Sequence, residues 1–227
     1  MNTETILVLC GGLGTRLKSI TGELPKSMVD INGRPFINLL ISKWNKEGFK
    51  NIIFLLGYKS DFMKDELSKI EKNYSLNFKY SIEDEQLGTG GAVLNAINNF
   101  GLNKPFCVSN GDTWVDSKMN KIRKSLSPSI ATIEVNKNKR YGEIEVRNKR
   151  ITGFKEKNEL QKKTLINAGI YMLDKSCFKD VKKKIFSLEH DLFPFLVKNK
   201  FVKSVKIEGK FIDIGVPEDY LKFCQLM

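Results

Sequence analysis

The feature that most limits the fold of this chain is the alternation of short apolar runs with segments of helical periodicity. In one such segment, apolar residues recur at helical spacing as Ile37, Leu40, Ile41 and Trp44. In the first half, strand-like runs cover residues 5–10, 51–56, 78–82 and 105–109, and helical segments cover residues 36–47, 61–70 and 90–98. Strand–helix–strand alternation predicts a largely parallel sheet with helices on both faces.

The second half of the chain has a different pattern. After Ser129, strand-like runs follow one another closely, at residues 130–135, 142–146, 150–154 and 166–173. Closely spaced strands are typical of antiparallel pairs. Helical patterns return at residues 191–198 and 217–225, around strand-like runs at 202–207 and 211–214. We therefore predict an α/β fold, Rossmann-like in its first half, with a mixed but mostly parallel sheet and a small antiparallel insertion.

Length and composition exclude some classes of protein. The 227 residues, 41% of them hydrophobic, suffice for one well-buried core. No apolar run approaches the roughly 20 residues of a membrane span, and the first run is too short for a signal peptide. We therefore expect a cytoplasmic protein without a membrane partner. The net charge of +12 fits a polyanionic substrate, nucleic acid or a general richness in lysine, so charge alone does not decide between them.

Cysteine and histidine usage narrows the chemistry. The four cysteines are far apart and show no paired spacing, which disfavours a zinc site or a disulfide framework. Cys10 and Cys107 stand in apolar runs, so we interpret them as small core residues. The single histidine is His190, which excludes a mechanism that needs both a histidine base and a histidine metal ligand.

The most informative segment is the turn after the first strand-like run, which carries Gly11, Gly12 and Gly14 and is followed by Arg16 and Lys26. Glycines let backbone N–H groups approach phosphate oxygens, and open sheets bind ligands at the carboxyl ends of their strands. Arginine offers phosphate a planar fork, and lysine a mobile point charge. An ordinary strand-to-helix turn is the alternative, and neither the dinucleotide fingerprint nor the P-loop string is present. We favour a phosphate-binding loop.

Two aspartates follow strand-like runs elsewhere in the chain. Asp112 ends the string Asn110-Gly111-Asp112, and Asp213 stands shortly before Pro217, which opens a helical segment. Magnesium is usually held by one or two carboxylates together with substrate phosphates. Each aspartate alone is also typical of a turn or a helix cap. Both together, in a chain with a phosphate loop, favour a metal site.

The string Gly-Gly-Leu-Gly-Thr-Arg-Leu at residues 11–17, with Pro25-Lys26, resembles the signature of the sugar-phosphate nucleotidyltransferases. In detail it is most similar to the guanylyltransferases that act on mannose or D-glycero-α-D-manno-heptose 1-phosphate, and the likeness runs from about Thr5 to Tyr220. The resemblance implies that GTP and a sugar 1-phosphate give a GDP-sugar and pyrophosphate for surface polysaccharide synthesis. It also implies that Asp112 and Asp213 hold Mg²⁺.

The chemistry of this reaction needs few protein groups. A sugar 1-phosphate is nearly dianionic at neutral pH, since its second pKa is about 6, and it can attack the α-phosphorus without a general base. The protein must align the reactants and neutralise charge on the reacting phosphate and the departing pyrophosphate. We expect Arg16, Lys26 and Asp112 to be the catalytic residues.

The resemblance places the acidic segment after residue 82 beside the nucleobase, with Glu83 at the base edge. A carboxylate only accepts hydrogen bonds, and guanine presents two adjacent donors, so Glu83 favours GTP. The alternatives are a solvated acidic loop, or a relative that uses UTP, CTP or dTTP with a hexose 1-phosphate. The expected nucleotide contacts are Leu9, Gly11, Gly12, Gly14, Thr15, Arg16, Glu83, Gly88, Thr89, Asn110 and Gly111.

For the sugar side, the resemblance implies that Gly142, Glu156 and Asn167 line the pocket and that Lys157 reaches the sugar phosphate. A carboxylate and an amide can bind neighbouring hydroxyls. The family often has proline after the Glu-Lys pair, whereas this chain has Asn158. Residues 187–194 resemble a segment that caps a helix, and His190 is expected at the surface.

We expect one domain over residues 1–227, with a nucleotide-binding part at about 1–115, a sugar-binding part at about 116–227 and no further C-terminal domain. A non-catalytic nucleotide-sugar-binding subunit is an alternative that the two cations and two aspartates disfavour. A glycosyltransferase would not need Arg16 and Lys26, and a nucleic-acid partner is not expected, since it rests on charge alone. The sequence does not fix the oligomeric state, for which a homodimer is one candidate.

Overall fold

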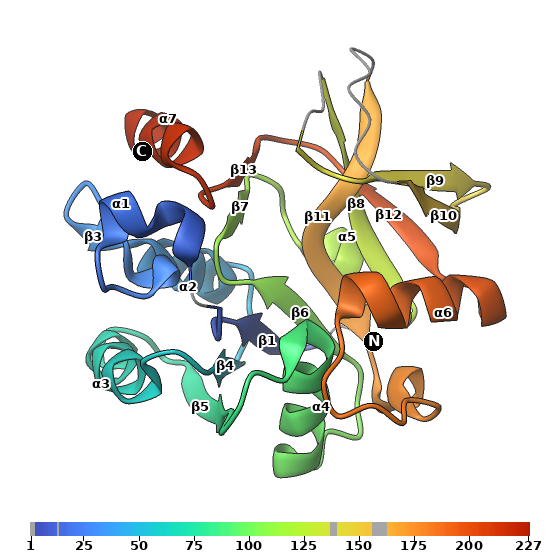
Figure 1. Cartoon of the computed structure of the whole chain (residues 1–227), viewed down its shortest axis with the longest axis horizontal. Helices are drawn as coiled ribbons and strands as arrows, with labels where there is room; N and C mark the ends of the chain where they lie inside the picture. Colours follow the sequence, from blue (N-terminus) through green and yellow to red (C-terminus); the bar gives the residue numbers. More distant parts are fainter. Residues whose placement is uncertain (1–2, 13, 137–139, 156–162) are drawn as a thin grey trace.

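The computed structural model describes residues 3–12, 14–136, 140–155 and 163–227. Within these ranges one sheet of nine strands has the order β5-β4-β1-β6-β11-β8-β12-β10-β9 (Figure 1). Its strands are β1 (Thr5–Leu9), β4 (Asn51–Leu56), β5 (Asn77–Ile82), β6 (Phe106–Asn110), β8 (Ser129–Val135), β9 (Glu143–Arg147), β10 (Arg150–Lys155), β11 (Thr164–Leu173) and β12 (Lys203–Ile207). Two short antiparallel pairs are separate from this sheet: β2 (Asp30–Ile31) with β3 (Arg34–Pro35), and β7 (Thr113–Val115) with β13 (Phe211–Asp213).

The strand directions confirm the predicted change of pattern along the chain. Strands β5, β4, β1 and β6 are parallel neighbours. Strand β11 runs antiparallel to both β6 and β8, and β9 pairs antiparallel with β10. Strand β12 returns parallel to β8. The first half is thus a parallel α/β unit, and antiparallel strands extend its sheet.

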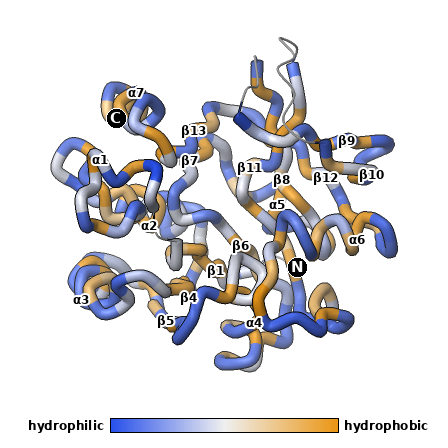
Figure 2. Tube along the Cα trace, in the orientation of Figure 1, coloured by the Kyte–Doolittle hydropathy of each residue, from blue (hydrophilic) through white to orange (hydrophobic). Residues whose placement is uncertain are grey.

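Helices cover both faces of the sheet, as predicted. They are α1 (Lys18–Thr21), α2 (Phe36–Lys46), α3 (Ser60–Glu71), α4 (Gly88–Phe100), α5 (Asn120–Arg123), α6 (Phe193–Asn199) and α7 (Pro217–Leu226). Buried side chains of α2, α3, α5 and α7 belong to one hydrophobic cluster, and those of α4 and α6 to a second. In Figure 2 the central strand β1, which carries apolar colouring, lies between α2 on one side and α4 on the other.

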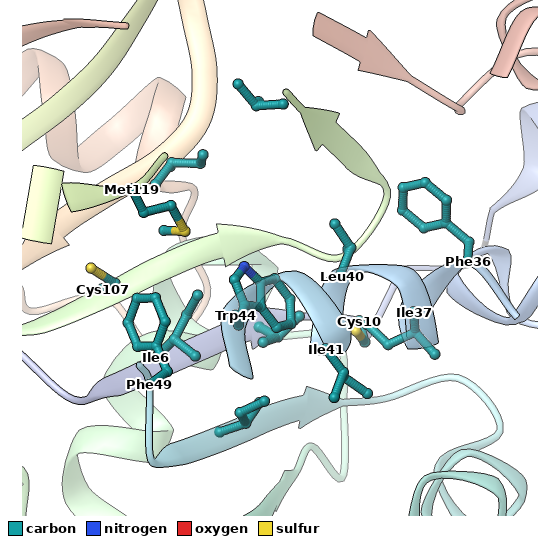
Figure 3. Packing of buried hydrophobic residues seen from close by; sticks show 14 of the residues in the cluster. Ile6, Cys10, Phe36, Ile37, Leu40, Ile41, Trp44, Phe49, Cys107 and Met119 are labelled. Carbon is teal, nitrogen blue, oxygen red and sulfur yellow. The ribbon is translucent and has the colours of Figure 1, made fainter. Parts of the chain in front are cut away.

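The alternation of β1 side chains explains the two clusters. Ile6 and Val8 join the cluster under α2, whereas Leu7 joins the one under α4, because successive side chains of a strand point to opposite faces. Figure 3 shows Trp44 of α2 beside Ile6, with Leu40 further along the same helix. Each fully buried side chain of this kind contributes about 1.5–3 kcal/mol, and this packing holds the carboxyl end of β1 in a fixed place.

The element boundaries agree with the sequence to within a few residues, but several short elements were not predicted. Among them, β7 matters most, because it pairs with β13, which was predicted, and this pairing sets Asp213 opposite Thr113. Cys10 and Cys107 are buried and His190 is exposed, as expected. In the described part of the chain, every helix is too short or too polar to cross a membrane.

Candidate active site

A cavity of about 680 Å³ opens at the carboxyl ends of β1 and β6 and beside the first turn of α4. It is called the cleft below. The cleft brings together all the predicted nucleotide contacts and all three expected catalytic residues. These are Leu9, Gly11, Gly12, Gly14, Thr15, Arg16, Lys26, Glu83, Gly88, Thr89, Asn110, Gly111 and Asp112.

The three glycines of the turn after β1 have different surroundings. A Cβ on Gly11 would lie 3.0 Å from Oε1 of Glu83, so this glycine lets the carboxylate approach the backbone. Gly14 has a φ of 63°, a left-handed conformation that favours glycine. A Cβ on Gly12 would meet no atom within 4 Å. Gly12 therefore leaves open space at the cleft, which is the property a phosphate-binding turn needs.

The ends of β1 and β6 meet at Gly111. Its N–H donates to the Leu9 carbonyl at 3.0 Å, and a Cβ there would lie 2.6 Å from Cys10 Sγ and 2.7 Å from the Leu9 oxygen. A side chain at this position would push the two strand ends apart. The glycine thus brings Asn110 and Asp112 close to the turn after β1.

Lys26 lies between two carboxylates. Its Nζ is 2.6 Å from Asp112 Oδ2 and 3.6 Å from Asp213 Oδ1, and the lysine side chain is only 11% exposed. The β7–β13 pairing produces this arrangement, and the N–H of Ile214 donates to the Asp112 carbonyl at 3.1 Å. The two aspartates are 101 positions apart in the sequence, so the structure brings together what the sequence predicted as a pair.

Arg140 is a cation of the site that the sequence did not identify. Its guanidinium lies 3.4 Å from Asp213 Oδ2 and also pairs with Asp219 in α7. The neighbouring Tyr141 has its pKa raised to about 12, by burial first and then by the negative charge of Asp213. The sequence offered one signal, the position of Arg140 directly before the Tyr141-Gly142 pair, but no pattern that names its partner.

Asp112 and Asp213 are the two carboxylates that could hold a metal ion. In the described ranges, no group of three or more histidine, cysteine or acidic side chains is placed to hold a metal. Asp112 and Asp213 nevertheless face one shared ammonium group, so the space between them already accommodates positive charge. Two carboxylates plus substrate phosphates form the donor set that magnesium takes in nucleotide sites.

The acidic segment after β5 places one of its three acids in the cleft. Glu83 is half-buried, and its Oε2 accepts a hydrogen bond from the Leu87 N–H at 2.9 Å. Burial raises the pKa of the Glu83 carboxyl above its ordinary value. Asp84 and Glu85 are exposed, and Glu85 pairs with Lys184. The geometry therefore favours Glu83 as the residue that would contact a base.

The glycines at the start of α4 are explained by chain packing. Gly88 has a φ of 72°, and a Cβ there would lie 2.6 Å from the Phe186 carbonyl oxygen. The N–H groups of Gly90 and Gly91 donate to that same oxygen at 2.9 and 3.2 Å. The segment around Phe186 thus closes the amino end of α4, and Gly88 and Thr89 form part of the cleft wall beside it.

The cleft lining contains none of the described residues that were predicted to bind the sugar. Glu156 and Lys157 lie outside the described residues. Among the described residues, Gly142 and Asn167 are not part of the cleft lining. Asn167 donates from Nδ2 to the Tyr171 hydroxyl at 2.9 Å and accepts the Gly169 N–H at 2.9 Å.

Glu189 lines the cleft, but the sequence did not identify it as a site residue. Its carboxylate accepts hydrogen bonds from Tyr171 at 3.0 Å, Thr89 at 2.8 Å and Ser187 at 2.9 Å. The sequence indicated a helix cap here, and that prediction is confirmed, because Ser187 Oγ accepts the N–H groups of Glu189 and His190. Because the sequence explains the acidic residues here by helix capping, it did not indicate that Glu189 also lines the cleft.

Known proteins resemble this chain over nearly its full length. The model of the nucleotidyl transferase family matches residues 5–226. The D-glycero-α-D-manno-heptose 1-phosphate guanylyltransferase of Campylobacter jejuni is 38% identical over 219 residues, which cover 96% of this chain and 97% of that protein. A mannose-1-phosphate guanyltransferase of Saccharomyces cerevisiae is 33% identical, with 95% of this chain and 62% of that protein covered.

A solved structure supports the same relationship. The crystal structure of HddC from Yersinia pseudotuberculosis complexed with GMP-PN has a TM-score of 0.86 and is 37% identical, with 100% of this chain and 99% of that chain covered. The agreement extends through both the parallel and the antiparallel parts of the sheet. With the family model matched over almost the whole sequence and relatives above 30% identity, the chain belongs to the nucleotidyl transferase family.

Proposed function

We propose that the chain transfers a guanylyl group from GTP to a manno-configured sugar 1-phosphate and releases pyrophosphate and a GDP-sugar. The preferred acceptor is D-glycero-α-D-manno-heptose 1-phosphate, with mannose 1-phosphate as the alternative. The names of two relatives support this choice. The observation that carries the proposal is the presence in one cleft of Glu83, the glycine turn after β1 and the Lys26–Asp112 pair.

Glu83 would select guanine. One lone pair of its Oε2 is used by the Leu87 N–H, which fixes the carboxylate and leaves acceptor positions on both oxygens. Guanine offers an N1–H and a 2-amino group side by side, and a carboxylate can accept from both. Adenine and the pyrimidines lack this pair of adjacent donors, so they would leave the half-buried carboxylate incompletely paired.

The turn after β1 would hold the triphosphate. Gly12 leaves its backbone accessible, and Arg16 is exposed at the cleft, with no hydrogen bond or ion pair to another described residue. Arg16 and Lys26 would neutralise charge on the phosphates as the sugar phosphate attacks the α-phosphorus. Asp112 and Asp213 would hold Mg²⁺, which when bound supplies further positive charge to the phosphates.

The two substrates would use different parts of one domain. We assign nucleotide binding to residues of about 1–115 and sugar binding to residues of about 116–227. Asn167 supports this division, because it stands on β11, at the border between the parallel and antiparallel strands. Gly142 precedes β9, which pairs with β11 at Ile166.

The test is a pyrophosphate-release panel. The purified chain is mixed with GTP, ATP, UTP, CTP or dTTP and with the 1-phosphates of manno-heptose, mannose or glucose, with and without Mg²⁺. We expect release with GTP and a manno-configured acceptor, and dependence on the added metal. Release confined to UTP would contradict the role given to Glu83, and equal activity in EDTA would contradict the role given to Asp112 and Asp213.

A further inference from the structure

We propose that Glu189 is a positioning residue that connects the nucleotide side of the cleft to the sugar side. This inference rests on the proposed function, because it assigns Thr89 to the nucleotide and Asn167 to the sugar. Neither the family signature nor the predicted ligand set includes Glu189. One carboxylate in the cleft wall fixes both substrate-binding sides relative to each other.

The first observation is the set of hydrogen bonds around the carboxylate. Oε1 accepts from the Tyr171 hydroxyl at 3.0 Å, and Oε2 accepts from Thr89 Oγ1 at 2.8 Å and Ser187 Oγ at 2.9 Å. These partners come from β11, from α4 and from the segment before α6. Three elements that are distant in sequence therefore meet at one side chain.

The second observation is the common direction of these bonds. The Tyr171 hydroxyl accepts a hydrogen bond from the Asn167 amide at 2.9 Å and donates its own hydrogen bond to Glu189. The Thr89 hydroxyl likewise receives the Leu188 N–H at 2.9 Å and donates to Glu189. Each of these two hydroxyls accepts one hydrogen bond and donates its own to Glu189. The group that receives both must therefore be an acceptor, and an ionised carboxylate only accepts hydrogen bonds.

The third observation is the position of this centre. Tyr171 is fully buried, whereas Glu189 is partly exposed and lines the cleft. No cation of the described ranges forms an ion pair with Glu189, although the chain carries a net charge of +12. A carboxylate that served packing alone would not need to line the cleft.

The network has two branches that can be cut separately. Tyr171 and Asn167 form the sugar branch, and Thr89 forms the nucleotide branch. Tyr171→Phe removes the hydroxyl of the first branch and keeps the buried ring. Thr89→Val removes the hydroxyl of the second branch at nearly constant volume. Glu189→Ala removes the acceptor that both share.

The experiment measures the KM for GTP and for D-glycero-α-D-manno-heptose 1-phosphate, together with Tm, in each variant. We expect Glu189→Ala to raise both KM values about tenfold, as the loss of a charged hydrogen-bond centre predicts. Glu189→Gln, which retains one acceptor oxygen, should lie between Glu189→Ala and wild type. Tyr171→Phe should raise mainly the KM for the sugar phosphate, and Thr89→Val mainly the KM for GTP.

The matched control is Asp191→Asn in the same segment. Asp191 accepts the Ser187 N–H at 2.8 Å and pairs with the exposed Lys183, away from the cleft lining. This variant should lower Tm and leave both KM values unchanged. If Glu189→Ala behaves like Asp191→Asn, with a lower Tm and both KM values within twofold of wild type, Glu189 only supports packing and the inference is wrong.

The proposed function and this inference fail in different ways. If the wild-type chain releases pyrophosphate only with another nucleotide, the guanylyl assignment fails, and the same variants are then measured with that nucleotide. If the wild type is active as proposed and the two branch variants change both KM values equally, the connection through Glu189 fails and the proposed function remains.

Discussion

The ammonium of Lys26 lies 2.6 Å from the carboxylate of Asp112, although the two residues are 86 positions apart in the sequence. The same ammonium is 3.6 Å from Asp213. A positive charge therefore stands between the two carboxylates that we assign to Mg²⁺. Lys26 and a metal ion would have to share this space with the phosphates. The contribution of each can be measured as the effect of Mg²⁺ on stability with and without Lys26.

Replacement of Lys26 by alanine removes the ammonium that lies between the carboxylates of Asp112 and Asp213. We expect the free energy of unfolding to fall by roughly 1–2 kcal/mol, less than for a fully buried pair because Asp112 is one-third exposed. Added Mg²⁺ should recover more stability in the variant than in wild type, since it replaces the missing charge. Urea titrations with EDTA or Mg²⁺ check this.

Lys18→Ala is the control for Lys26→Ala. Lys18 pairs with Glu23 at 3.8 Å, and both side chains are more than two-thirds exposed. Its loss should change neither the stability nor the effect of Mg²⁺. An equal response to Mg²⁺ in wild type and Lys26→Ala would show that the ammonium does not stand where the metal binds.

Asp112→Asn should lower kcat/KM about 10²- to 10³-fold and raise the Mg²⁺ concentration needed for half-maximal activity. The amide keeps the shape of the side chain but removes one of the two negative charges that the metal needs. Asp116→Asn is the matched control, because Asp116 is exposed just beyond β7. Pyrophosphate release as a function of Mg²⁺ concentration measures both variants, and an unchanged Mg²⁺ requirement in Asp112→Asn would exclude it as a ligand.

The sequence was sufficient where local patterns determine the structure. The continuous apolar run of β1 predicts a strand that is buried on both faces, and the helical spacing in α2 predicts a helix with one buried face. The glycine turn was recognisable, because only glycine leaves the backbone as open as it is at Gly12. These features depend on neighbours in the sequence, and the structure places them as predicted.

The sequence was insufficient where distant segments meet. The pairing of β7 with β13 joins two strands of only three residues each, which is too short for a periodic pattern to indicate the pairing. Arg140 gains its role from Asp213, and Glu189 from Tyr171, through contacts that span separate elements. Such residues look like ordinary surface charges until the fold places their partners.

Gly12→Ala and Gly91→Ala should separate binding from stability. A Cβ on Gly91 would lie 2.6 Å from the Lys184 carbonyl oxygen, so Gly91→Ala should cost about 1–3 kcal/mol of stability. A Cβ on Gly12 meets nothing within 4 Å, so Gly12→Ala should leave the stability within about 0.5 kcal/mol of wild type. It should nevertheless lower kcat/KM for GTP tenfold or more, if phosphate occupies that space.

Chemical denaturation and initial rates measure the two glycine variants. The pattern expected for Gly12→Ala is normal unfolding with weak GTP binding. A Gly12→Ala enzyme with normal kinetics would mean that the phosphates lie elsewhere in the cleft.

Glu83 makes GTP use dependent on pH. Burial raises the pKa of its carboxyl above the ordinary value of 4.5, so the group becomes protonated while ordinary carboxyls are still ionised. A protonated carboxyl cannot accept from both guanine donors. We therefore expect kcat/KM for GTP to fall as the pH is lowered through this raised pKa.

Glu83→Gln separates this effect from titration of the sugar phosphate, whose second pKa is about 6. The variant should lose about tenfold or more in kcat/KM for GTP at neutral pH. The fall in its kcat/KM at low pH should then reflect protonation of the sugar phosphate alone.

The effect of Glu83 on folding stability depends on pH in the opposite direction. Because the folded-state pKa of Glu83 is raised, its contribution is fully present below the unfolded-state pKa and is lost as the pH rises through the folded-state pKa. Glu83→Gln should therefore be more stable than wild type near pH 8, and this difference in stability should disappear at acidic pH. If both proteins show the same dependence of stability on pH, Glu83 is not held in a desolvated position.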